Sequence, residues 1–184
     1  MELHYLDSVR KQFSYYRSLG EKAMAQVSDE GLFVQPDNES NSIAIIVKHL
    51  WGNMMSRWTD FRTTDGEKPW RQRDTEFENH MNGREQVMQL WNEGWSCLES
   101  ALNSLTDREL GEIIYIRNEG HTILAAINRQ LAHYPYHIGQ MVYLAKMLSY
   151  GHWTSLSIPR NQSGNYNERK FSQDKGIRHF TDDI

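Results

Sequence analysis

The chain has 184 residues, a mass of 21.7 kDa and a formal charge of −4, with 20 basic and 24 acidic residues. A general nucleic-acid binder would carry a basic face and a high pI, so this charge and the pI of about 6.1 argue against that class. Hydrophobic residues make up 39% of the chain, enough for one domain with a buried core and too many for disorder throughout. The single cysteine, Cys97, excludes a disulfide framework and a cysteine-based zinc finger, whereas eight histidines permit a histidine metal site.

Membrane insertion and secretion are not expected from the apolar runs. The longest purely apolar runs, 43–47 and 123–127, have five residues each, whereas a membrane-spanning helix needs about 20. The N-terminus lacks the basic flank and apolar run of a signal peptide. We therefore expect a cytoplasmic protein that acts on a small molecule, with neither a nucleic-acid nor a membrane partner.

Four segments have apolar residues at helical spacing. The predicted helices cover 1–27, 42–61, 83–105 and 122–150. Pro135 lies inside the last of them, where proline usually kinks a helix. Residues 62–82 have no clear period, which predicts either a functional segment or a long crossover between helices that are not antiparallel neighbours.

Shorter elements are expected around these helices. Thr106 and Glu109 have capping-box spacing and could cap a short extra turn. The β-branched and aromatic run 113–116, followed by a turn with Gly120, predicts a small β-hairpin before the last long helix. The polar composition after Ile158 predicts a domain over 1–158 and an irregular tail over 159–184, so the expected fold class is all-α with one hairpin.

His133 and His137 form the sharpest local motif. Histidines at i and i+4 stand one above the other on a helix and can bind one metal ion. The spacing is that of a zincin metalloprotease, but no Glu follows His133, so the general base of that class is missing.

A third histidine, His49, lies at a similar angle from the apolar stripe of its own predicted helix. Relative to Ile127, His137 lies about 80° and His133 about 120° to the same side of the apolar stripe. His49 lies about 120° from Ile43 in the same rotational sense. Residues displaced in the same rotational sense from the apolar stripes of two helices can face each other when the helices are antiparallel neighbours. The second and fourth predicted helices should therefore be antiparallel. The second and third should then be parallel, with 62–82 as the crossover between them.

These positions predict a metal site made of His49, His133 and His137. Three neutral imidazoles suit Zn²⁺ or Ni²⁺, and three protein ligands leave a coordination position for water or substrate. The alternative is that the His133 and His137 pair is a surface coincidence and His49 a hydrogen-bonded flank residue.

The sequence pattern gives weaker indications of a role for Cys97 and for the other polar residues. Cys97 falls near the apolar stripe of the third helix and is expected to pack there. Arg117, Arg129, Gln130 and Gln140 could frame a substrate, although Arg129 and Gln140 also suit solvated helix positions. The remaining histidines are expected to be structural or solvated: His4, His80, His121, His152 and His179.

Over residues 1–158 the chain resembles the DinB-like superfamily of metal-binding four-helix bundles, which includes the YfiT-like metal-dependent hydrolases and thiol-dependent transferases. The resemblance is carried by the motifs Ile46-Val47-Lys48-His49-Leu50 with Gly52-Asn53, Ile116-Arg117, Ala132 to Met141 with its two histidines, and Trp153 to Arg160. More narrowly, these motifs are similar to those of an uncharacterised bacterial subgroup.

The resemblance implies an up-down-down-up bundle, a homodimer and a divalent metal held by His49, His133 and His137. Characterised relatives use the metal to activate a low-molecular-weight thiol, such as bacillithiol or mycothiol. We therefore expect a metal-dependent transferase of such a thiol to a small electrophile. The alternatives are a metal-dependent hydrolase and a non-catalytic, stress-related metal-binding dimer. The spread of Trp51, Met55, Trp91 and Trp95 around two helices also predicts apolar surface for a second copy.

Overall fold

The computed structural model describes residues 5–182 and is mostly helical. Its helices and strands are α1 (Tyr5–Met24), α2 (Ile43–Trp58), α3 (Arg84–Asn103), β1 (Ile113–Ile116), β2 (Glu119–Thr122), α4 (Ile123–Leu148) and α5 (Ser163–Phe171). Short 3-10 helices lie at Glu30–Phe33, Asp74–Phe77 and Asp107–Glu109. The four predicted long helices are therefore present. Helices α2, α3 and α4 are shorter at both ends than their predicted ranges, and α1 ends at Met24 instead of residue 27. Positions 1–4 of the first predicted helix lie outside the described residues.

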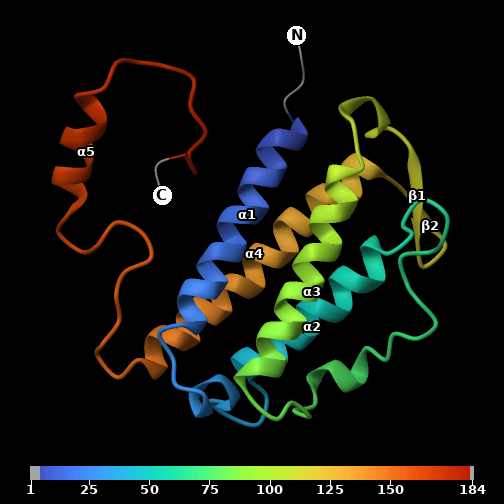
Figure 1. Cartoon of the computed structure of the whole chain (residues 1–184), viewed down its shortest axis with the longest axis horizontal. Helices are drawn as coiled ribbons and strands as arrows, with labels where there is room; N and C mark the ends of the chain where they lie inside the picture. The colour runs from blue at the N-terminus through green and yellow to red at the C-terminus, as the bar shows by residue number, and fades with distance from the viewer. Residues whose placement is uncertain (1–4, 183–184) are drawn as a thin grey trace.

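The four long helices lie side by side, and their directions follow from the connections (Figure 1). Helices α2 and α3 run the same way, whereas α1 and α4 run opposite to them. The segment between Trp58 and Arg84 returns along the molecule from the end of α2 to the start of α3. Helices α2 and α4 are thus antiparallel, as the positions of the histidines predict.

Local sequence explains where α2 and α4 begin. The Ser42 hydroxyl accepts a hydrogen bond from the Ile45 N–H, and the Thr122 hydroxyl accepts one from the Ala125 N–H. Each side chain thereby satisfies an N–H group that has no partner within the helix. Helix α4 continues through Pro135 to Leu148.

The predicted hairpin is present between α3 and α4. Strand β1 pairs antiparallel with β2, with Ile113 opposite Thr122 and Ile116 opposite Glu119. Outside the hairpin, the Gly66 N–H donates to the Tyr115 carbonyl oxygen at 2.7 Å. The crossover segment and the hairpin are therefore joined at the end of the molecule where α4 begins.

An aromatic cluster lies at the centre of the core. Phe13, Trp95 and Tyr134 have ring centroids 5.8–6.3 Å apart, and Trp91 lies 5.4 Å from Trp95. The prediction that the two tryptophans supply surface for a second copy is wrong, because Trp91 is 2% and Trp95 0% exposed. The large apolar area of the two tryptophans is instead buried in the core, where edge-to-face contacts between aromatic rings add to the attraction.

The C-terminal segment differs from the irregular tail expected over 159–184, because it contains α5. This helix stands apart from the four long helices in Figure 1, and none of its residues is buried. The chain then returns to α1, where His179 Nε2 lies 3.1 Å from Ser8 Oγ and Lys11 donates to Asp182 at 2.6 Å. Polar contacts and the Phe180 ring, whose centroid lies 5.6 Å from that of Tyr15, hold the end of this segment against α1.

Within residues 5–182, no helix combines the length and the apolar character that crossing a membrane requires.

Candidate metal centre

The structure brings the three predicted histidines together at one site. His49 lies on α2, and His133 and His137 lie one turn apart on the antiparallel helix α4. Their potential ligand atoms all lie within 4.8 Å of one another. His133 is central, because its Nε2 atom lies 3.4 Å from His49 Nε2 and 3.1 Å from His137 Nε2. Two helices far apart in sequence thus present three imidazole nitrogens to the same point.

Each imidazole is oriented through its other nitrogen. His49 Nδ1 lies 2.9 Å from a carboxylate oxygen of Glu76. His133 Nδ1 lies 3.3 Å from Gln130 Oε1, and His137 Nδ1 lies 2.9 Å from Gln140 Oε1. An oxygen acceptor at Nδ1 favours the tautomer that carries its proton there, which leaves a lone pair on Nε2. All three rings therefore direct unprotonated nitrogens at one another.

The surroundings of the site make protonation of these imidazoles unfavourable. Burial, together with the neighbouring His137 and His49, lowers the pKa of His133 to about 3. Burial also lowers the pKa of His137, although its hydrogen bond to Gln140 opposes the change. A cation can be shared by the facing lone pairs of this tautomer, and three neutral imidazoles are a donor set that Zn²⁺ and Ni²⁺ accept.

Two of the three separations between the nitrogens fit such a cation. With Zn–N bonds of 2.0–2.1 Å in a tetrahedral arrangement, ligand nitrogens are about 3.3 Å apart. The two measured separations at His133 are 3.1 and 3.4 Å. The three-histidine group could therefore hold a metal ion, although nothing in the structure identifies the element.

The crossover segment supplies a buried ion pair behind His49. Glu76 is 4% exposed and accepts hydrogen bonds from Arg71 Nε at 2.7 Å and Arg71 Nη2 at 3.0 Å. Burial is the largest influence on the pKa of Glu76 and raises it, but the hydrogen bonds and charges of His49 and Arg71 outweigh burial and lower it. Glu76 is thus a carboxylate, held by Arg71 against the His49 ring.

Three residues of α2, Lys48, His49 and Gly52, contact the crossover segment. The Lys48 ammonium donates to the carbonyl oxygens of Thr75 and Glu78, which holds the 3-10 helix Asp74–Phe77 against α2. A Cβ atom at Gly52 would stand 2.3 Å from Glu76 Oε1, so the missing side chain lets the carboxylate approach. The Phe77 ring then stacks on His49 with centroids 5.2 Å apart. These contacts explain the Lys-His-Leu-x-Gly run around His49.

The site is also connected to the core. The Trp58 indole N–H donates to the Tyr134 hydroxyl, which donates to Asn53 Oδ1, each at 3.1 Å. Tyr134 is fully buried and directly follows His133 in α4. Core packing therefore fixes the rotation of α4 that points His133 and His137 at α2.

A cavity of about 450 Å³ opens in front of the three histidines. Its other walls come from α2, the crossover segment, the hairpin turn and α4. Besides the histidines it is lined by Asn53, Arg57, Arg71, Arg73, Phe77, Arg117, Arg129, Gln130 and Tyr136. The volume is that of a pocket for a small molecule.

The predicted framing residues divide into two groups. Arg117 and Arg129 line the cavity and are exposed. Gln130 is 2% exposed and, like Gln140, faces a histidine Nδ1 atom. Both amides therefore lie where they can orient imidazoles, and Gln130 also lines the cavity.

Sequence reasoning did not single out Glu76, Arg71, Phe77 or Arg57 as parts of the site. The lack of a clear period in 62–82, which predicted a functional segment or a crossover, was the available signal, and the structure confirms the crossover. A carboxylate that reaches His49 from 27 residues away leaves no periodic pattern in the sequence.

The remaining histidines are distributed away from this group. His80 is exposed and lies 2.7 Å from Glu78, and His152 is exposed. His121 is half-buried on β2, and His179 contacts Ser8 and Thr181. His4 lies outside the described residues.

Cys97 packs between α3 and α2, as predicted. Its Sγ lies 3.6 Å from Thr59 Oγ1 and 3.9 Å from the Met54 carbonyl oxygen. Burial raises the pKa of the thiol, which opposes a role as a nucleophile.

The fold and the site define a mostly helical protein with a three-histidine group that could hold a metal. The chain belongs to the family described as "Protein of unknown function (DUF1572)", whose model matches residues 1–162. No curated protein and no solved structure matches the chain.

Proposed function

We propose that this protein is a divalent-metal-dependent enzyme in which His49, His133 and His137 hold one metal ion, with Zn²⁺ or Ni²⁺ as the first candidates. The observation that carries the proposal is the convergence of three Nε2 atoms whose rings are oriented at Nδ1 by Glu76, Gln130 and Gln140. The directions of the four long helices and the histidine motifs also support a DinB-like, up-down-down-up four-helix bundle.

The reaction that we propose is transfer of a low-molecular-weight thiol to a small electrophile. A bound divalent ion would supply an open coordination position at which a thiol is held as thiolate near neutral pH. The chain has no thiol of its own for this chemistry, because Cys97 is packed between helices outside the cavity lining. Phe77 and Tyr136 offer apolar walls for the electrophile beside the histidines.

A metal-dependent hydrolase is less well supported. Hydrolysis by a metal-bound water usually uses a nearby general base, and no Asp or Glu lines the described cavity. The nearest carboxylate, Glu76, is already bonded to His49 and Arg71. A non-catalytic, stress-related metal-binding dimer remains the alternative if no substrate is turned over.

The proposal is tested with Co²⁺-loaded protein purified without a histidine tag, to which L-cysteine is added as a probe thiol. We expect a thiolate-to-metal absorption band and transfer of the thiol to a generic aryl halide, both lost in His137→Ala. Hydrolysis of nitrophenyl esters without added thiol would instead indicate the hydrolase.

The metal part of the proposal can fail separately. We expect Zn²⁺ to raise the melting temperature with increasing excess, because it binds the folded chain. A metal content below about a tenth of an equivalent, with no change in melting temperature on adding Zn²⁺ or Ni²⁺, would exclude the site.

We further propose that the protein is a homodimer that uses an exposed face of α4. Three large side chains, spaced at 7 and 4 residues, lie on this face: Tyr136, Tyr143 and Met147, which are 63%, 68% and 51% exposed. Apolar surface gathered on one helix face is typical of an interface. Sedimentation equilibrium should give twice 21.7 kDa, and Tyr143→Asp should shift it toward the monomer. A monomeric wild-type protein at micromolar concentration would rule out the dimer.

A further inference from the structure

The cavity in front of the histidines is lined by five arginines and, within residues 5–182, by no carboxylate. The arginines come from α2, the crossover segment, the hairpin turn and α4: Arg57, Arg71, Arg73, Arg117 and Arg129. Among the described residues, two carboxylates, Glu67 and Glu76, form ion pairs with them. Three guanidinium charges are therefore left over in a chain whose overall charge is −4.

Two of the arginines have structural partners. Arg57 is 6% exposed and donates to the Gly66 carbonyl oxygen and to Glu67. The Arg71 side chain is 2% exposed and is bonded to both oxygens of Glu76. These two side chains hold the crossover segment and form the floor of the cavity.

The other three have guanidinium nitrogens available to a ligand. Arg117 is bonded through Nε alone to Glu67 at 3.0 Å, and its side chain is 58% exposed. Arg73 lies over the Phe77 ring, 5.2 Å from its centroid. Arg129 forms no hydrogen bond or ion pair in the part of the chain that the structure describes. All three residues are exposed at the cavity.

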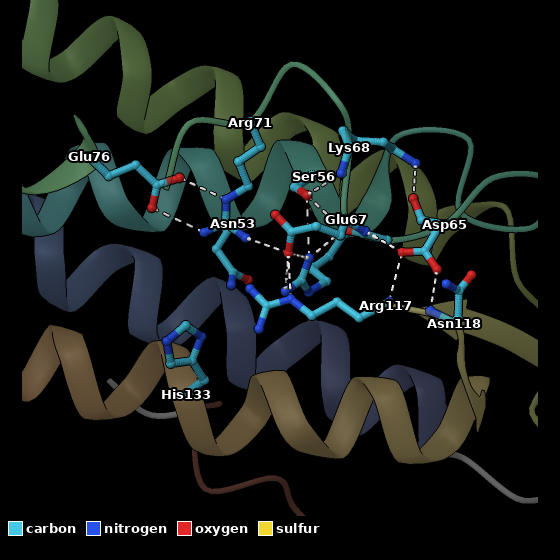
Figure 2. Close-up of polar contacts among 12 residues, drawn as sticks. Asn53, Ser56, Asp65, Glu67, Lys68, Arg71, Glu76, Arg117, Asn118 and His133 are labelled. Atoms are coloured by element: carbon cyan, nitrogen blue, oxygen red, sulfur yellow. Dashed lines mark hydrogen bonds and ion pairs between the residues drawn. The ribbon is translucent and has the colours of Figure 1, made fainter. Parts of the chain in front are cut away.

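Arg117 is positioned by a braced turn. Arg117 and Asn118 have φ angles of 56° and 62°, in the left-handed region that few non-glycine residues adopt. The Asp65 carboxylate accepts from both of their backbone N–H groups at 2.8 Å. Figure 2 shows this brace at the hairpin and the Arg117 side chain extending from it past Glu67 toward Asn53. The turn thereby places the Arg117 side chain at the wall of the cavity, where it stays 58% exposed.

We propose that Arg73, Arg117 and Arg129 form a subsite for a doubly charged anion, either a phosphate monoester or a pair of carboxylates, on the small molecule that reacts at the histidine site. The inference rests on the proposed function and adds the substrate class to it. Guanidinium groups bind such anions through paired N–H donors, and their attraction is strong in a partly enclosed cavity. A dianion offsets most of the excess charge, whereas a neutral substrate leaves it unbalanced.

The test is calorimetric titration of inorganic phosphate and of succinate into the wild-type protein. We expect at least one to bind with a Kd below about 1 mM and to bind at least about tenfold more weakly to Arg117→Gln and Arg129→Gln. Arg108→Gln is the matched control, since Arg108 is exposed and does not line the cavity. Preference for phosphate identifies a phosphate monoester, and preference for succinate identifies a dicarboxylate.

Each titration is made on metal-free and on Zn²⁺-loaded protein, so that the two proposals can fail separately. Anion binding to metal-free protein supports the subsite even where Zn²⁺ does not bind the histidines. Absence of binding of both anions in both forms, or equal affinities in wild type, Arg117→Gln and Arg129→Gln, overturns the subsite. Neither result changes the test of metal binding by the histidines.

Discussion

The His133→Ala variant is expected to lose tight binding of Zn²⁺, with a fall in affinity of at least about 100-fold. His133 is the central member of the group, since its Nε2 lies within 3.4 Å of the same atom in both other histidines. Removing it leaves two nitrogens on different helices and too few protein ligands for a stable tetrahedral site. Competition titration against a chromophoric zinc chelator measures the change.

His80→Ala is the matched control for this substitution. Its imidazole is exposed and contacts only Glu78 among the described residues, so the affinity for Zn²⁺ should equal that of the wild type. The shift in melting temperature on adding Zn²⁺ should persist in His80→Ala and vanish in His133→Ala. Equal affinities in His133→Ala and wild type would show that the convergence of the three histidines does not bind metal.

The Glu76→Gln variant is expected to lose both stability and metal affinity. Its carboxylate is the counterion of Arg71, whose side chain is 2% exposed, and removing one partner of a buried pair costs about 3 kcal/mol. The same carboxylate orients His49, and loss of such a partner typically lowers metal affinity about 10- to 100-fold. Urea unfolding of metal-free protein and zinc titration measure the two effects.

Two further variants separate these effects. Glu78→Gln changes an exposed carboxylate two residues away and should leave both quantities unchanged. The double variant Arg71→Met, Glu76→Met should recover most of the stability, because an apolar pair replaces the ion pair, but none of the metal affinity. If Glu76→Gln behaved like Glu78→Gln, the buried pair would neither hold the crossover segment nor orient His49.

Sequence patterns predicted the elements whose signal is local. Helical spacing of apolar residues located α1 to α4, since a helix buries every third or fourth residue whatever it packs against. The run 113–116 and the turn after it predicted the hairpin for a similar local reason. An error arose where burial depended on neighbours: Trp95 packs with Phe13 and Tyr134, and Trp91 packs with Trp95, so neither supplies surface for a second copy.

The sequence by itself predicted which three histidines meet, because i, i+4 spacing and a position beside the apolar stripe are properties of single helices, and the antiparallel packing of α2 and α4 brings them together. It also determined that no cysteine framework and no membrane-length apolar run exist. Only the tertiary structure decided that Glu76 and Arg71 stand behind His49, that Gln130 and Gln140 orient the other rings, and that five arginines line one cavity. The contact between Glu76 and His49 and the walls of the cavity join segments far apart in the chain, and an aperiodic crossover is placed by its partners rather than by its own pattern.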